Sequence, residues 1–154
     1  MAPGPRSDQG FLLSLFSLES RVALVTGGSS GIGQAIARAL ALAGARTVLL
    51  ARREDPLDRA VRALRAAGCD AAWVSADVAD RADVLRGATA AAEQFGEPDI
   101  VVNAAGVNIR PPLAELTTAD WDTLMAVNLT APFLLGQRSW RVPRRRPCRS
   151  ASRT

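Results

Sequence analysis

The chain has 154 residues, 48% of them hydrophobic and 22% charged, which is typical of one globular domain. It contains no His and no Tyr, and all 19 basic residues are Arg. With no His and only two cysteines, Cys69 and Cys148, the sequence argues against a metal site and a disulfide framework, and it predicts a reducing, cytoplasmic compartment. Residues 138–154 carry seven Arg and no acid, so the net charge of +4 leaves −3 on residues 1–137. The positive charge therefore gives no reason to expect nucleic-acid binding by the folded part.

The two ends of the chain differ from its centre. Residues 1–20 are predicted to be a lead-in, because the apolar run 11–18 is too short to span a bilayer and no signal-peptide cleavage site follows it. Residues 21–137 have the pattern of a domain. Residues 138–154 are predicted to be a disordered basic tail, since apolar periodicity is lost and Arg and Pro predominate. A nucleic-acid-binding arm is the alternative for the tail, but no aromatic residue follows Trp140 to stack on bases. We expect neither a nucleic-acid nor a membrane partner.

Strand and helix patterns alternate through residues 21–137. Four apolar runs are predicted as buried strands: 22–25, 47–50, 71–75 and 100–102. Four segments with helical spacing are predicted as helices: 31–43, 55–67, 81–95 and 118–137. This alternation predicts an α/β fold, a Rossmann-type doubly wound parallel sheet truncated to about four strands with flanking helices.

Individual residues predict where three of these helices begin and where one of them bends. Asp55, before Pro56, is expected to cap the helix that begins there. Asp80 and Asp83 have the spacing of a capping box at the start of the third helix. Residues 117–120 form a start signal for the fourth helix, which Pro132 is expected to bend or interrupt.

The segment 26–33, TGGSSGIG, joins the first strand to the first helix. Phosphate groups bind at helix N-termini, where N–H groups are unpaired and the helix dipole is positive. Gly27 is expected to permit the tight turn, Gly31 the close approach of a ligand, and Gly33 the packing of the helix on the strand. Thr26 and Ser29 have no His or Lys to activate them as nucleophiles, so turn and phosphate hydrogen bonding is expected of them.

The residues after the second strand select between two nicotinamide cofactors. An acid at this point would bind the ribose hydroxyls of NAD and repel a 2′-phosphate. The chain instead has Arg52 and Arg53, whose guanidinium groups suit the 2′-phosphate of NADP. The sequence therefore favours NADP over NAD, the alternative being that both arginines simply face solvent.

Four motifs follow one another at the ends of successive predicted elements: TGGSSGIG at 26–33, Asp77-Val78, NAAG at 103–106, and Asn128. Together they resemble the short-chain dehydrogenases/reductases, over about residues 16–137. Within that family the segments LFSLESRVALVTGG, NAAGVNIRPPLAEL and DWDTLMAVNLTAPFLL are most similar to gluconate 5-dehydrogenase-type and 3-oxoacyl-carrier-protein reductase-like members. The resemblance implies an NAD(P)-dependent oxidoreductase that transfers hydride between the nicotinamide and a carbonyl or alcohol substrate.

The resemblance also implies roles for individual residues. Asp77 would accept a hydrogen bond from the adenine amino group, with the Val78 amide nearby, and residues 103–106 would line the adenosine. Asn128 would be the active-site Asn that holds a water in the proton relay, and the helix 118–137 would form a homo-oligomer interface. The predicted cofactor-binding residues are Gly27, Ser29, Ser30, Gly31, Ile32, Gly33, Arg52, Arg53, Asp77, Val78, Asn103, Ala104, Ala105 and Gly106.

Apart from Asn128, the catalytic residues of the family are missing from these 154 residues. The family uses a Tyr, a Lys four positions later and a Ser, but this sequence has no Tyr and no Lys. Ser139 and Ser150 stand in the wrong context for the catalytic Ser. We therefore expect an inactive truncated or frameshifted form of an oxidoreductase, whose fourth strand is left as an apolar edge. The alternative is a non-catalytic dinucleotide-binding or hetero-oligomer partner protein.

Overall fold

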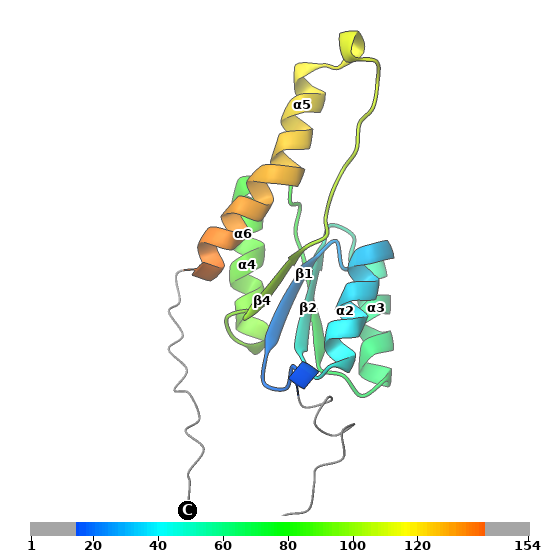
Figure 1. Ribbon diagram of the computed structural model, residues 1–154, viewed down its shortest axis with the longest axis vertical. Helices are drawn as coiled ribbons and strands as arrows, with labels where there is room; N and C mark the ends of the chain where they lie inside the picture. Colours follow the sequence, from blue (N-terminus) through cyan, green and yellow to red (C-terminus); the bar gives the residue numbers. More distant parts are fainter. Residues whose placement is uncertain (1–14, 141–154) are drawn as a thin grey trace, which may run out of the picture.

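The computed structural model describes residues 15–140, so most of the predicted lead-in and residues 141–154 of the predicted tail lie outside the described part. Four parallel strands form one sheet in the order β3-β2-β1-β4 (Figure 1). The strands are β1 Val22–Thr26, β2 Arg46–Ala51, β3 Ala71–Ser75 and β4 Ile100–Asn103. The sheet matches the four predicted strands to within one residue at each end, and β4 lies at an edge of the described sheet, as expected.

Helices cover both faces of this sheet (Figure 1). The helical elements are α2 Gly31–Leu42, α3 Glu54–Ala66, α4 Arg81–Phe95, the 3₁₀ turn η1 Leu113–Glu115, α5 Thr118–Met125, the π-helical turn η2 Ala126–Thr130 and α6 Ala131–Trp140. Successive side chains of a strand point to opposite faces. Val25 and Leu49 accordingly pack with α2 and α3, whereas Leu24 and Leu50 pack with α4 and α6. The predicted Rossmann-type, doubly wound architecture is confirmed.

The helix N-termini depart from the sequence predictions at two aspartates. Asp55 is not a cap: Arg53 occupies the N-cap position of α3 and makes no side-chain capping bond, while Asp55 lies within the first turn. Asp80 does cap α4, because its carboxylate accepts from the Ala82 and Asp83 amides. The predicted capping box is nevertheless wrong, since the Asp83 carboxylate turns away from the cap and binds the Asp77 amide at 2.6 Å.

The helix predicted over 118–137 is divided by the π-helical turn. Thr117 caps α5 in a full capping box with Asp120, and these bonds lower the pKa of the Asp120 carboxyl. Pro132 has no N–H to donate to the carbonyl four residues earlier, so the regular α-helical bonding cannot continue through this point. The chain takes a π turn just before Pro132, and α6 then continues to Trp140, past the boundary predicted at 137. No helix within residues 15–140 is long and apolar enough to cross a membrane.

The Thr26 hydroxyl joins the carboxyl ends of β1 and β4. Thr26 is buried, donates to the Val102 carbonyl at 3.4 Å, and accepts from the amides of Ala104 at 3.2 Å and Ala105 at 3.1 Å. These two amides lie just beyond the last β1–β4 pair, Thr26 with Asn103, so no strand can accept from them. The hydroxyl therefore fixes the path of the NAAG segment as it leaves the sheet.

Thr26→Val keeps the shape of the side chain but leaves the two amides without this acceptor. We expect the free energy of unfolding to fall by about 1–3 kcal/mol, the usual cost of an unsatisfied buried polar group. Urea denaturation measures the loss, and amide hydrogen exchange at Ala104 and Ala105 should accelerate. Thr26→Ser, which keeps the hydroxyl, is the control. Unchanged exchange at both amides in Thr26→Val would contradict this role.

Candidate functional site

A cavity of about 280 Å³ lies at the carboxyl ends of the strands. It brings together ten of the predicted site residues: Gly27, Ser29, Ser30, Arg52, Arg53, Asp77, Val78, Ala104, Ala105 and Gly106. The segment after β4 and helix α5 extend beyond this edge of the sheet (Figure 1). Segments as far apart in sequence as Gly27 and Gly106 thus meet at one place, because parallel strands end together where the connecting loops begin.

The three glycines of the turn have different surroundings in the structure. Gly27 has a φ of +66°, and a Cβ on it would lie 2.8 Å from the Ala105 amide nitrogen, so no side chain fits there. Gly31 also has a positive φ, +55°, but its missing Cβ would point into open space. Gly33 packs closely on the Gly27 carbonyl, so at this position it is the approach of α2 to the turn that leaves no room for a side chain. Gly27 and Gly33 are therefore required by the protein's own packing, whereas Gly31 leaves space on the solvent side.

The N-terminus of α2 is open to an anion. Ser30 is its N-cap residue but makes no side-chain capping bond, and the first turn holds no acidic residue. The amides of this turn therefore retain unpaired donors at the positive end of the helix dipole. Ser29 and Ser30 line the cavity beside them, while the predicted Ile32 is exposed and lies outside it.

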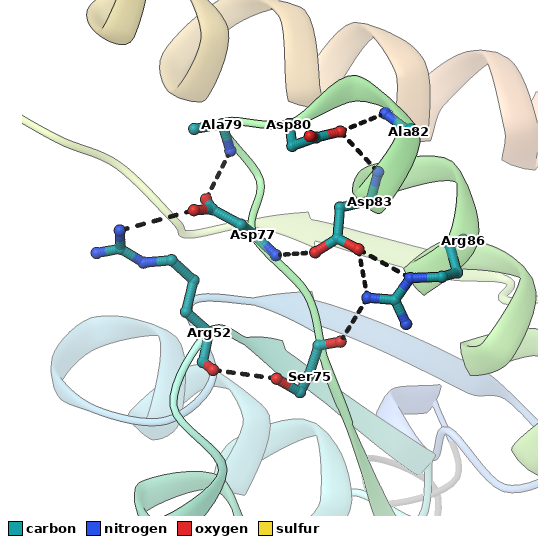
Figure 2. Close-up of polar contacts among 8 residues, drawn as sticks. All are labelled: Arg52, Ser75, Asp77, Ala79, Asp80, Ala82, Asp83 and Arg86. Carbon is teal, nitrogen blue, oxygen red and sulfur yellow. Dashed lines mark hydrogen bonds and ion pairs between the residues drawn. The ribbon is translucent and has the colours of Figure 1, made fainter.

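Two arginines, Arg52 and Arg53, and one aspartate, Asp77, form the charged side of the cavity. Figure 2 shows Arg52 and Asp77. Arg52 Nη1 lies 3.8 Å from Asp77 Oδ2, and both side chains are substantially exposed, 70% and 42% respectively. Arg53 has no ion-pair partner among residues 15–140. The cavity thus offers one guanidinium that is already paired and one that is available to an anionic ligand.

Hydrogen bonds hold Asp77 at both its backbone and its side chain (Figure 2). The Asp77 carboxylate accepts from the Ala79 amide at 2.9 Å, and the Asp77 amide donates to Asp83 Oδ2 at 2.6 Å. That backbone bond, followed by the Arg86 guanidinium, lowers the pKa of the Asp83 carboxyl. Asp83 is therefore ionised at neutral pH and remains so down to below its ordinary value of about 4.

The predicted residues after β4 divide into two groups. Ala104, Ala105 and Gly106 line the cavity, whereas Asn103 ends the strand and does not. Asn128 also lies outside the cavity wall: its amide accepts from Val107 N at 3.1 Å and donates to Val107 O at 2.9 Å. It sits in the π turn, a helix irregularity that often occurs at functional sites. Its visible role is to hold the backbone that follows the NAAG segment.

The sequence did not identify two cavity residues on the long helical segment. Thr123 from α5 and Val127 from the π turn both line the cavity. They stand four positions apart and thus on one side of the helix, with no sequence motif to mark them. No group of His, Cys, Asp and Glu side chains in the described ranges could hold a metal ion.

The known proteins that this chain resembles match it over the residues that form the sheet, its helices and the cavity. Residues 21–142 match the family model described as "short chain dehydrogenase". Gluconate 5-dehydrogenase of Gluconobacter oxydans is 43% identical over 123 residues, which are 80% of this chain and 48% of that protein. D-threitol dehydrogenase of Mycolicibacterium smegmatis is 42% identical over 122 residues, 79% of this chain and 47% of its own length.

Solved structures agree with this result. A short chain dehydrogenase from Burkholderia cenocepacia, crystallised in complex with NADP, superposes with a TM-score of 0.77 at 38% identity, covering 80% of this chain and 51% of that one. The chain spans about half the length of the curated relatives it matches. The motifs, the doubly wound sheet and the matched family model lead to one assignment: the chain belongs to the short-chain dehydrogenase/reductase family.

Proposed function

We propose that residues 21–137 bind a nicotinamide dinucleotide in the cavity at the carboxyl edge of the sheet, with NADP preferred over NAD. The observation that carries the proposal is the meeting, in one cavity, of the open N-terminus of α2 with Arg52 and Arg53. The pyrophosphate would bind the α2 amides beside Ser29 and Ser30, where Gly31 leaves room for it. The 2′-phosphate would bind Arg53, supported by Arg52.

The charges around Asp77 favour the phosphorylated cofactor. An unpaired carboxylate at this point would repel a 2′-phosphate, but the Arg52 guanidinium lies beside the Asp77 carboxylate and offsets its charge. Asp77 keeps accepting positions for the adenine amino group, the role that its family motif implies. The Burkholderia relative crystallised with NADP, and a metagenomic short-chain oxidoreductase 43% identical to this chain, also crystallised with NADP, support the same choice.

Binding of the cofactor would not be followed by hydride transfer in this chain. Reduction of a carbonyl needs a proton donor for the oxygen, and the family supplies it from a Tyr beside a Lys. Neither residue type occurs among these 154 residues. We therefore propose that the family's activity, hydride transfer between nicotinamide and a carbonyl or alcohol, is absent from this chain alone, which retains cofactor binding.

The long helix provides a surface for a second copy. Trp121, Leu129 and Phe133 follow one another along α5, the π turn and α6, and each is more than half exposed. Exposed apolar side chains gathered along one helical segment are typical of protein interfaces. We propose that homo-oligomers form through residues 118–137; a different short-chain dehydrogenase subunit in the same place is the hetero-oligomer alternative.

Arg53→Ala should separate the two cofactors. We expect the dissociation constant for NADPH to rise about tenfold, the effect of losing one charge-assisted hydrogen bond, with little change for NADH, which has no 2′-phosphate. Titration followed by cofactor fluorescence measures both constants. Arg59→Ala, which removes an exposed arginine of α3 outside the cavity, is the matched control and should change neither. Equal weakening of NADPH and NADH would contradict the assignment of Arg53.

The purified 154-residue chain should show no NADPH-linked turnover. We expect no loss of NADPH absorbance with a panel of ketones and aldehydes, because no group is present to protonate the developing alkoxide. Gluconate 5-dehydrogenase of Gluconobacter oxydans, assayed in parallel, checks the assay. Substrate-dependent NADPH oxidation by the chain, retained after removal of trace contaminants, would show that another residue supplies the proton.

A further inference from the structure

Asp83 and Arg86 of α4 bind the backbone of the segment that leaves β3, at Asp77 and at Ser75 (Figure 2). Asp83 Oδ2 accepts from the Asp77 amide at 2.6 Å, and Oδ1 accepts from Arg86 Nε at 2.8 Å and also from Arg86 Nη2. Arg86 Nη2 in turn lies 3.4 Å from the Ser75 carbonyl oxygen. The pair therefore holds the chain on both sides of Ala76, just where β3 ends.

Further hydrogen bonds connect this segment to Arg52, the residue that follows β2. Ser75 Oγ donates to the Arg52 carbonyl oxygen at 3.0 Å, and the Arg52 guanidinium forms the ion pair with the Asp77 carboxylate. Arg52 and Asp77 are thus linked twice, once directly through exposed side chains and once through Ser75, Arg86 and Asp83. In the second link the Asp83 side chain is 26% exposed and the Arg86 side chain 61%, so the bond from the Asp77 amide to Asp83 is its most sheltered part.

The position of Asp77 explains why such a link is needed. The β2–β3 ladder ends with Ala51 opposite Ser75, and the Ala76 amide makes a last bond to Ala51. The next amide, that of Asp77, has no strand to pair with and takes its acceptor from Asp83. Asp83 lies in the first turn of α4, so the start of this helix fixes the site at which the Asp77 backbone is held.

We infer that Asp83, oriented by Arg86, is a positioning residue for the dinucleotide: it fixes Asp77 and, through Ser75, Arg52 in the geometry that receives the adenosine part of the cofactor. This inference rests on the proposed function. It assigns to Asp83 a role in affinity, in addition to any contribution to the stability of α4. The neighbouring Asp80 shows the contrast, since its carboxylate binds only the first amides of its own helix.

The two aspartates provide a matched test. Asp83→Ala and Asp80→Ala each remove a carboxylate that accepts backbone bonds at the N-terminus of α4, and both are expected to lower the melting temperature. We expect the dissociation constants for NADPH and NADH to rise about tenfold in Asp83→Ala, because both cofactors carry adenosine, and to change less than twofold in Asp80→Ala. Equal affinities in the two variants, at a temperature where both are folded, would overturn the inference.

Two further measurements exclude a merely structural role. Asp83→Asn keeps an acceptor for the Asp77 amide but loses the charge that orients Arg86, so its affinity should lie between those of the unsubstituted chain and Asp83→Ala; it also serves if Asp83→Ala does not fold. In an Asp77→Ala background, Asp83→Ala should weaken binding much less than it does alone, because its effect passes through Asp77. Fully additive losses would contradict this.

The controls also separate the inference from the proposed function. If the unsubstituted chain binds neither NADPH nor NADH, the proposed function fails and the inference fails with it. If the unsubstituted chain binds NADPH and Asp83→Ala binds equally well, the inference alone fails. Binding that weakens in Asp83→Ala and not in Asp80→Ala supports both.

Discussion

The architecture of the site depends on one constraint, the need of backbone amides beyond the end of a strand for an acceptor. Parallel strands end at a common edge, and the peptide groups that follow their last paired residues have no neighbouring strand. Three side chains from other segments satisfy them here: Thr26 for Ala104 and Ala105, Asp83 for Asp77, and Asn128 for Val107. Each holds a loop in a defined path around the cavity, so the rim is ordered by the protein itself.

The helices differ in whether a side chain caps their N-terminus. Helices α4 and α5 begin with side-chain caps from Asp80 and Thr117, whereas α2 and α3 have none. A missing cap costs a helix about 1 kcal/mol of stability. The residues at the two uncapped starts, Ser30 and Arg53, both line the cavity. Of these two, α3 carries Glu54 and Asp55 in its first turn and α2 carries no acid there, so the donors of α2 are the ones left open where a phosphate would bind.

The strands and helices could be predicted from the sequence because an apolar run marks a buried strand or helix face and a glycine marks its end, and both signals lie within the element itself. Sequence reasoning also located Gly27, Arg52 and Asp77 in one cavity, since family motifs and the common edge of parallel strands both point there. It failed at Asp83, because an acid three residues after a cap residue has the same spacing whether it turns back to the cap or outward to another strand. The partners of Thr26 and Asn128 were also missed: they are distant in sequence, and only the folded chain brings them together.

The ion pair of the Arg52 side chain is weak enough for a phosphate to replace the Asp77 carboxylate. Its ion pair with Asp77 joins two exposed groups at 3.8 Å, a type of contact that contributes about 0–1 kcal/mol. A phosphate approaching Arg52 can therefore compete for the guanidinium at little cost. The backbone of Arg52 would not move with it, because Ser75 holds its carbonyl and Asp83 with Arg86 holds the segment beyond. A weak side-chain pair on a backbone held by these bonds would let the Arg52 guanidinium exchange the Asp77 carboxylate for a phosphate while its main chain stays in place.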